Sequence, residues 1–247
     1  MHALILAAGL GTRLRPLTYA IAKPALPVAG EPIVRRIIRW LAVQGVTELV
    51  INLHYLPHTV TEIVGDGSDL GASVRYSWEY PEILGSGGGP RQALDILGED
   101  TFLIVNGDTL TDLNLRGLID AHTAADALVT LALVPNREPG KYGGVLMEDD
   151  GAVTRFVARH EAGDDSYHFI GVQVARAEAF RALPPRSPAR SIGGLYDALI
   201  AARRGSVRGV VTEAEFFDIG TIEDYRRTTA LWEKREAGRS PNRDTLS

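Results

Sequence analysis

The N-terminal stretch limits the fold of this chain more than any other segment. Residues 3–7 are a short apolar run that ends in a glycine-rich loop, which is typical of a strand buried on both faces. Glycine lets a backbone approach an anion and point its N–H groups at it. Because three cations, Arg13, Arg15 and Lys23, follow at once, the stretch predicts a polyphosphate site. A tight turn with solvated arginines is the alternative.

Two common glycine loops do not fit this stretch. The phosphate loop of the NTPases requires Lys-Ser or Lys-Thr after its glycines, and neither pair follows Gly9 or Gly11. The dinucleotide fingerprint requires a third glycine where Leu14 stands and then a helix. Pro16, Pro24 and later prolines favour a long irregular loop instead.

Length and composition narrow the class of protein. A chain of 247 residues with 45% hydrophobic and 23% charged residues suits one large domain, or one domain with a small appendage. A net charge of -5 gives no reason to expect nucleic acid or an anionic membrane as partner. The absence of cysteine excludes disulfides, thiolate catalysis and cysteine-bound zinc. No apolar run could span a bilayer and no signal peptide precedes the first strand, so a cytoplasmic location is expected.

Apolar strands alternate with amphipathic helices in the first half of the chain. We expect an α/β fold with a Rossmann-like, mostly parallel mixed sheet covered by helices on both faces. The expected strands are 3–7, 48–53, 73–78 and 101–105, and the expected helices are 32–44, 57–64 and a helix starting with 90–97.

The pattern changes after Asp108 and predicts a smaller lobe of mixed strands. Its expected strands are 127–134, 144–147, 152–157 and 167–174, with a hairpin turn at 149–151, and its expected helices are 177–183, 191–203 and a last one from Thr221 to about Arg235. We therefore expect a single domain over 1–236, with a first half at 1–112, a second half at 113–236 and a frayed tail at 237–247.

Two acids are candidates for metal binding. Asp108 follows a buried strand at the carboxyl edge of the expected sheet, where doubly wound folds bind ligands, although it would also suit a turn. Asp218 lies between apolar residues and a glycine, where a carboxylate is costly to bury without a cation. The two carboxylates could hold one Mg²⁺ together with phosphate oxygens.

The motif Gly9-Leu10-Gly11-Thr12-Arg13-Leu14-Arg15-Pro16-Leu17-Thr18, followed by Lys23-Pro24, resembles the signature of the sugar-1-phosphate nucleotidyltransferases. The resemblance extends from Met1 to about Tyr225 and implies a nucleotide-binding half at 1–112 and a sugar-binding half at 113–236. It implies that a sugar-1-phosphate attacks the α-phosphorus of a nucleoside triphosphate in line, giving an NDP-sugar and pyrophosphate. It also implies Mg²⁺, with Mn²⁺ as the substitute ion, held by Asp108 and Asp218. The expected catalytic residues are Arg13, Lys23 and Asp108.

The same resemblance implies the nucleotide site. Its expected residues are Leu6, Ala8, Gly9, Gly11, Thr12, Arg13, Lys23, Glu79, Gly85, Gly87, Gly88, Asn106 and Asp108. Glu79 is the expected base reader, because a carboxylate can accept from two donors of guanine or from the single imino donor of uracil. The run 85–89 has too many glycines for a helix or strand and is expected to let the base or ribose lie on its backbone.

On the sugar side the chain departs from the family pattern. The expected sugar-binding residues are Gly143, Arg159, Phe169 and Gly171, with Arg159 where relatives have lysine and Phe169 where they have asparagine. These departures resemble the N-acetylmuramate-1-phosphate uridylyltransferases and favour UTP with that sugar phosphate. GTP with mannose-1-phosphate is the alternative, since Glu79 and the pair Leu84-Gly85 are common in guanylyltransferases. A non-catalytic subunit that senses NDP-sugars is the alternative from another class, and a homo-oligomer is left open.

Overall fold

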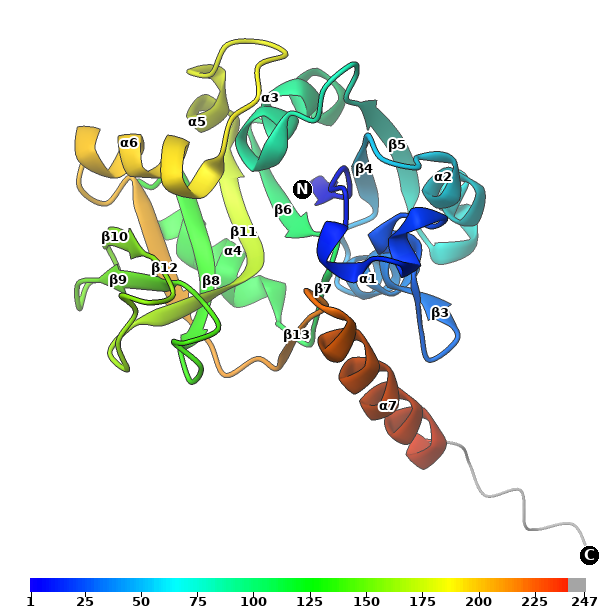
Figure 1. The fold of residues 1–247 in the computed structure, drawn as a ribbon. Helices are drawn as coiled ribbons and strands as arrows, with labels where there is room; N and C mark the ends of the chain where they lie inside the picture. The colour runs from blue at the N-terminus through cyan, green and yellow to red at the C-terminus, as the bar shows by residue number, and fades with distance from the viewer. Residues whose placement is uncertain (240–247) are drawn as a thin grey trace, which may run out of the picture.

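The computed structural model describes residues 1–239. Within these residues, nine strands form one mixed sheet in the order β10-β9-β11-β6-β1-β4-β5, and β8 pairs with β11 and β12 (Figure 1). The strands of this sheet are β1 (Ala3–Leu6), β4 (Glu48–Leu53), β5 (Ser73–Trp78), β6 (Thr101–Asn106), β8 (Val129–Pro135), β9 (Gly144–Met147), β10 (Val153–Val157), β11 (Tyr167–Arg176) and β12 (Val207–Val211).

The N-terminal half of the sheet is parallel, as the apolar runs predict. β1 lies between β4 and β6, and both pairs are parallel. In this register Leu6, the last residue of β1, is opposite Asn52 on one side and Asn106 on the other. Two polar side chains therefore flank the point where the glycine-rich loop begins.

Strand β11 joins the two halves of the chain. It pairs antiparallel with β6 on one side and with β8 on the other. β9 and β10 form the expected antiparallel hairpin, and β12 runs parallel to β8. The C-terminal half therefore extends the same sheet and does not build a separate one.

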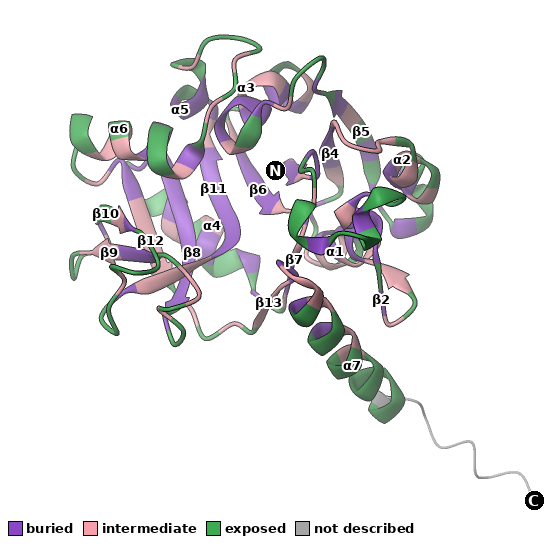
Figure 2. Cartoon of the chain, viewed as in Figure 1, coloured by how far each residue is buried: buried purple, intermediate pink, exposed green. Residues whose placement is uncertain are grey.

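Helices cover both faces of the sheet, which confirms the predicted α/β class. Their bounds are α1 (Ile33–Val43), α2 (His58–Val64), α3 (Gly85–Leu97), α4 (Leu115–Ala124), α5 (Ala177–Arg181), α6 (Tyr196–Ala202) and α7 (Ile222–Arg239). Buried residues of α1, α2 and α4 share one core cluster, and those of α3, α5 and α6 share the other. The strands between the two layers are largely buried, while the outer faces of the helices are exposed (Figure 2).

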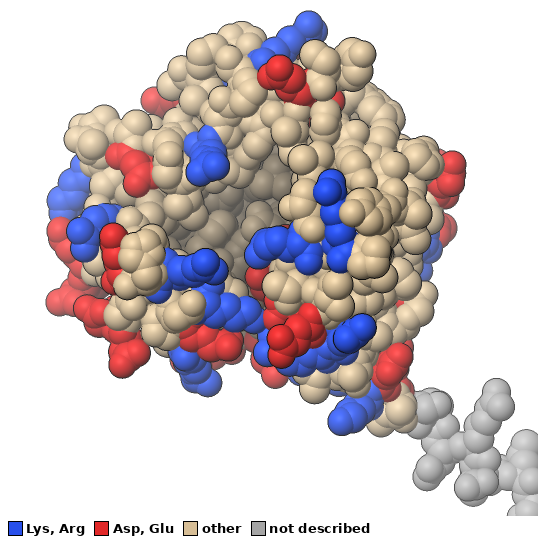
Figure 3. All heavy atoms as spheres, viewed as in Figure 1, with Lys and Arg blue, Asp and Glu red and all other residues tan. Residues whose placement is uncertain are grey.

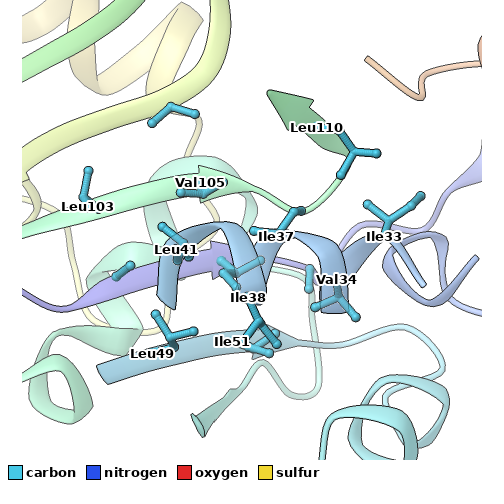
Figure 4. Packing of buried hydrophobic residues seen from close by; sticks show 14 of the residues in the cluster. Ile33, Val34, Ile37, Ile38, Leu41, Leu49, Ile51, Leu103, Val105 and Leu110 are labelled. Carbon is cyan, nitrogen blue, oxygen red and sulfur yellow. The ribbon is translucent and has the colours of Figure 1, made fainter. Parts of the chain in front are cut away.

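Helix α1 illustrates how the apolar spacing becomes packing. Its buried residues are Ile33, Val34, Ile37, Ile38 and Leu41, and they face Leu49 and Ile51 of β4 and Leu103 and Val105 of β6 (Figure 4). Burying each such side chain stabilises the fold by about 1.5–3 kcal/mol. This face holds the parallel strands, and thereby their carboxyl ends, in fixed positions.

Short elements complete the edge of the sheet where the strands end. β7 (Thr109–Thr111) pairs antiparallel with β13 (Phe216–Asp218), and β2 (Pro27–Val28) pairs with β3 (Glu31–Pro32). The sequence pattern predicted none of these, nor β12 and α4. A three-residue strand has too little sequence to show a period of two, so only its partner identifies it.

Three expected boundaries are corrected. Helix α3 begins at Gly85 rather than near Pro90, and α6 begins at Tyr196 after an irregular turn over Ser191–Leu195. Helix α7 continues through Arg239, so residues 237–239 are helical and not frayed. The rest of the predicted tail lies outside the described residues. No helix in the described part of the chain combines the length and the apolar composition needed to cross a membrane.

Candidate active site

A hollow opens at the carboxyl edge of the parallel strands. Figure 3 shows a concave face whose floor is mostly uncharged, with Lys and Arg side chains along part of its margin. Within it, a cavity of about 210 Å³ is lined by Leu6, Ala8, Gly9, Asn52, Ile83, Gly85, Ser86, Asn106 and Asp108. Six of these nine residues belong to the expected nucleotide site, and they come from β1, β6, α3 and the loops beside them.

The glycine-rich loop after β1 is irregular, as its prolines predict. Gly11 has φ +62°, and a Cβ there would lie 2.9 Å from Cγ2 of Thr18. The Thr18 hydroxyl also donates to the carbonyl oxygen of Gly11 at 2.8 Å. Gly9 differs, since no described atom lies within 4 Å of where its Cβ would stand. Packing therefore explains the glycine at 11 but not the one at 9.

Lys23 and Asp108 form an ion pair at the mouth of the cavity. The Lys23 ammonium donates to Oδ2 of Asp108, and their side chains are 11% and 29% exposed. Lys23 is held by a short helical turn that begins beside it, and Asp108 follows β6. The structure thus brings the third cation of the N-terminal motif to the first candidate acid.

Asp218 lies beside Asp108, although half of the chain separates them. Asp218 pairs with Thr109 in the β7–β13 ribbon, and the amide of Ile219 donates to the carbonyl oxygen of Asp108 at 3.1 Å. Burial and the nearby Asp108 charge raise the pKa of Asp218, and Lys23 and Arg13 partly oppose that shift. The positive charge of Lys23 and Arg13 is therefore not enough to offset the cost of ionising Asp218.

Arg13 approaches this acid at Gly220. A Cβ on Gly220 would lie 3.0 Å from Oδ2 of Asp218 and 3.2 Å from Nη1 of Arg13. Because glycine has no side chain, the Asp218 carboxylate and the Arg13 guanidinium can both lie close to residue 220. Arg13, Lys23, Asp108 and Asp218 consequently share one corner of the hollow.

The donor set in this corner fits a hard divalent cation. Two carboxylates repel each other when both are ionised, and a cation between them removes that cost. Among residues 1–239 no group of three or more His, Asp and Glu side chains could hold a metal ion. An ion here would need further oxygen ligands, which water and a polyphosphate can supply. In this structure the Lys23 ammonium neutralises Asp108.

The glycine run at 85–89 is helical, which corrects the sequence prediction of a non-helical segment. It forms the first turns of α3 and packs against the chain at 187–190. Cβ atoms on Gly85 and Gly87 would lie 2.8 Å and 3.2 Å from the carbonyl oxygen of Ala189. The Gly87 amide donates to the same oxygen at 2.9 Å. Glycine is thus required because two backbones touch.

Glu79, the expected base reader, has both carboxylate oxygens hydrogen-bonded within the protein. Its residue is 3% exposed, Oε1 accepts from Asn52 at 2.6 Å, and Oε2 accepts from the Leu84 amide at 2.6 Å. Burial raises its pKa, while these two hydrogen bonds oppose the rise. Asn52 in turn accepts from the Ala7 amide at 2.7 Å. Glu79 therefore connects the start of α3 to the start of the glycine-rich loop.

The remaining nucleotide candidates divide into two groups. Thr12 and Arg13 are exposed on the loop, whereas Gly87 and Gly88 are buried within α3 and do not line the cavity. Sequence reasoning missed Asn52, Ile83 and Ser86. Of these three residues, only Asn52 could have been found from the sequence. Like Asn106, it is a polar residue near the end of an apolar strand.

The four expected sugar-binding residues lie on neighbouring segments. Gly171, at φ +81°, faces Asn106, whose Nδ2 would be 2.8 Å from a Cβ at that position. A Cβ on Gly143 would meet the Val157 carbonyl oxygen at 2.9 Å and lie 3.9 Å from Arg159 N. The Arg159 side chain is exposed. Phe169 is half-buried against the core cluster on the α3 side.

Together, these features define an α/β protein whose sheet carries a glycine-rich loop, two cationic side chains and two acids at its carboxyl edge. The chain belongs to the nucleotidyl transferase family, whose model matches residues 2–235. The predicted family is thereby confirmed.

Individual relatives are similar to this chain over most of its length. It is 32% identical to a mannose-1-phosphate guanylyltransferase of Mycobacterium tuberculosis, over 93% of this chain and 64% of that protein. It is 34% identical to an N-acetylmuramate alpha-1-phosphate uridylyltransferase of Neisseria meningitidis, over 94% of this chain and 98% of that protein. The structure of HddC from Yersinia pseudotuberculosis complexed with GMP-PN superposes with a TM-score of 0.77 at 25% identity, covering 94% of this chain and 99% of that one.

Proposed function

We propose that this protein transfers a nucleotidyl group from a nucleoside triphosphate to a sugar-1-phosphate, releasing pyrophosphate. The observation that carries the proposal is the meeting of Arg13, Lys23, Asp108 and Asp218 beside the glycine-rich loop. In-line attack by the sugar phosphate needs no nucleophile from the protein, so positioning and charge neutralisation are the chemistry required. Both relatives described above carry names for this type of reaction.

Each charged residue has a separate task in this proposal. Arg13 neutralises the leaving pyrophosphate, and Lys23 leaves Asp108 to neutralise the α-phosphate as charge develops there. Backbone amides of residues 8–12 cradle the triphosphate, and the open space above Gly9 lets a phosphate approach the main chain. Asp108 and Asp218 would hold Mg²⁺, or Mn²⁺ in its place, which supplies charge neutralisation for the α-phosphate and the incoming phosphate.

For the substrate pair we propose UTP with N-acetylmuramate-1-phosphate. Phe169 replaces an asparagine of the family pattern and offers apolar contact for a lactyl or N-acetyl methyl group. The exposed Arg159 is available to pair with a lactyl carboxylate. One of the two arguments for guanine depended on a free Glu79 carboxylate, and both oxygens of Glu79 are hydrogen-bonded within the protein. The similarity to the Mycobacterium tuberculosis guanylyltransferase favours GTP with mannose-1-phosphate as the second candidate.

The reaction class is tested by following pyrophosphate release with a panel of nucleoside triphosphates and sugar phosphates, with and without Mg²⁺. Metal-dependent release is expected. Tight NDP-sugar binding without turnover by the wild-type protein would instead support a non-catalytic sensing subunit.

A competition assay decides the substrate pair. UTP and GTP are offered together with both sugar phosphates, and the two products are quantified. If GTP with mannose-1-phosphate wins by more than about tenfold, which corresponds to roughly 1.4 kcal/mol in transition-state binding, the uridylyl assignment is wrong.

A further inference from the structure

A buried carboxylate outside the catalytic corner connects two parts of the proposed site. Asp224, in the first turn of α7, is 4% exposed. Its Oδ1 accepts from Lys141 Nζ at 2.7 Å and from Arg227 at 3.1 Å, and its Oδ2 accepts from the Thr221 hydroxyl at 2.8 Å. The bond from Lys141 joins α7 to the loop that precedes β9, and the other two bonds come from the residue before α7 and from α7 itself.

The cationic partner belongs to the loop that carries Gly143. The amides of Lys141 and Tyr142 both donate to the carbonyl oxygen of Glu138, at 2.9 and 3.0 Å, which folds residues 138–142 into a turn. Gly143 follows at once. The Lys141–Asp224 ion pair therefore fixes the position of this turn relative to α7.

An aromatic stack next to the ion pair connects the turn at 138–142 to β11 and β13. The rings of Tyr142 and His168 are 4.1 Å apart between centroids, and those of His168 and Phe216 are 4.9 Å apart. Phe216 lies two residues before Asp218 in β13. The turn at 138–142 is thus attached on both sides of Asp218, by the stack at Phe216 and by the ion pair at Asp224.

We propose that Lys141 and Asp224 are a positioning pair that holds the sugar-side loop in register with the metal-side acid Asp218. This inference rests on the proposed function. Through it, a sugar phosphate bound at Gly143 would reach the α-phosphate held near Asp108 and Asp218 in a fixed orientation. Neither member of the pair touches the reacting atoms.

The position of the Lys141–Asp224 pair predicts that breaking it changes the KM for only one of the two substrates. Breaking the pair leaves the glycine-rich loop and the Lys23–Asp108 pair unchanged, because neither contacts Lys141 or Asp224. Lys141→Met and Asp224→Asn should each raise the KM for sugar-1-phosphate by about tenfold while the KM for the nucleoside triphosphate stays within about twofold. The double variant should be no worse than either single variant, since both remove the same contact.

Two matched variants separate positioning from other effects. Lys141→Arg keeps the ion pair and should restore most of the sugar-phosphate KM. Arg227→Ala removes the exposed partner of the same carboxylate, three residues along α7, and should leave both KM values unchanged. If Lys141→Met weakens sugar-phosphate use while Asp224→Asn does not, then Lys141 contacts the substrate directly and the proposal is overturned.

Amide hydrogen exchange gives a readout that does not require activity. Exchange at Lys141 and Tyr142 should accelerate in Lys141→Met and in Asp224→Asn, with no change in Arg227→Ala. Unchanged exchange in the first two variants would overturn the proposal even if their kinetics differ. If the wild-type protein releases no pyrophosphate with any substrate, the proposed function fails, and the exchange data still decide whether the pair fixes the loop.

Discussion

The main-chain amide of Ile219 donates a hydrogen bond of 3.1 Å to the carbonyl oxygen of Asp108. This bond continues the β7–β13 ribbon by one step and brings Asp218 close enough to Asp108 for the two charges to interact. Two acids from distant parts of the chain thereby form one anionic pair at the edge of the hollow. The arrangement costs stability, since burial and the Asp108 charge raise the pKa of Asp218.

Replacing Asp218 should therefore separate stability from activity. The pKa of Asp218 is raised in the folded state, so stability falls as pH rises from the ordinary pKa of the carboxyl through the raised value, and the cost persists above that window. At neutral pH, Asp218→Asn should raise the melting temperature and lower pyrophosphate release by at least about a hundredfold. Thermal unfolding and steady-state kinetics measure the two effects.

Asp120→Asn, on the exposed face of α4, is the matched control and should change neither quantity. A less stable Asp218→Asn protein would show that the carboxylate stabilises the fold. Full activity in that variant would remove Asp218 from the proposed metal site.

Gly9 and Gly11 should respond differently to alanine. Gly9→Ala meets no described atom within 4 Å and should leave the melting temperature unchanged, while raising the KM for the nucleoside triphosphate by about tenfold, because the methyl group stands where a phosphate would approach. Gly11→Ala should instead destabilise the protein by about 1–3 kcal/mol, owing to its φ of +62° and the nearby Thr18. An unaltered KM in Gly9→Ala would argue against a phosphate at that loop.

Glu79→Gln should affect folding and not base choice. The Oε2 atom accepts from the Leu84 amide, and an amide nitrogen in that place would leave a buried N–H without an acceptor. A loss of about 1–3 kcal/mol in the free energy of unfolding is expected from denaturant titration. The ratio of UTP to GTP use should be the same as in the wild-type protein, and a shift of that ratio would restore Glu79 as the base reader.

Acid should destabilise the protein partly through His122. This residue is 2% exposed, and burial lowers its pKa to about 4. Because the unfolded chain binds a proton near the ordinary value of about 6.5 and the folded chain does not, stability falls as pH drops through this window. Between about pH 7 and about pH 5 the loss from this residue is about 2 kcal/mol. His122→Gln should flatten the pH dependence of the melting temperature, and an unchanged slope would contradict the assignment.

Local pattern was sufficient for the main elements of the fold. The apolar runs at β1, β4, β5 and β6 and the spacing of α1 predict their own conformations, because burial on two faces or on one stripe requires those periods. The loop after β1 was likewise predictable from its glycines and prolines. These features depend on neighbours within a few residues.

The tertiary structure decided the features that depend on contacts from distant parts of the chain. The run Gly85–Gly89 looks flexible in sequence, yet it is helical because the backbone at 187–190 packs directly on it. Glu79 looks available for a base, yet Asn52 and Leu84 bury and bind its carboxylate. Likewise, β13 became a strand only by pairing with β7. In each case at least one partner lies far along the chain, so the periodicity of nearby residues cannot predict the hydrogen bonds and close packing that fix the conformation.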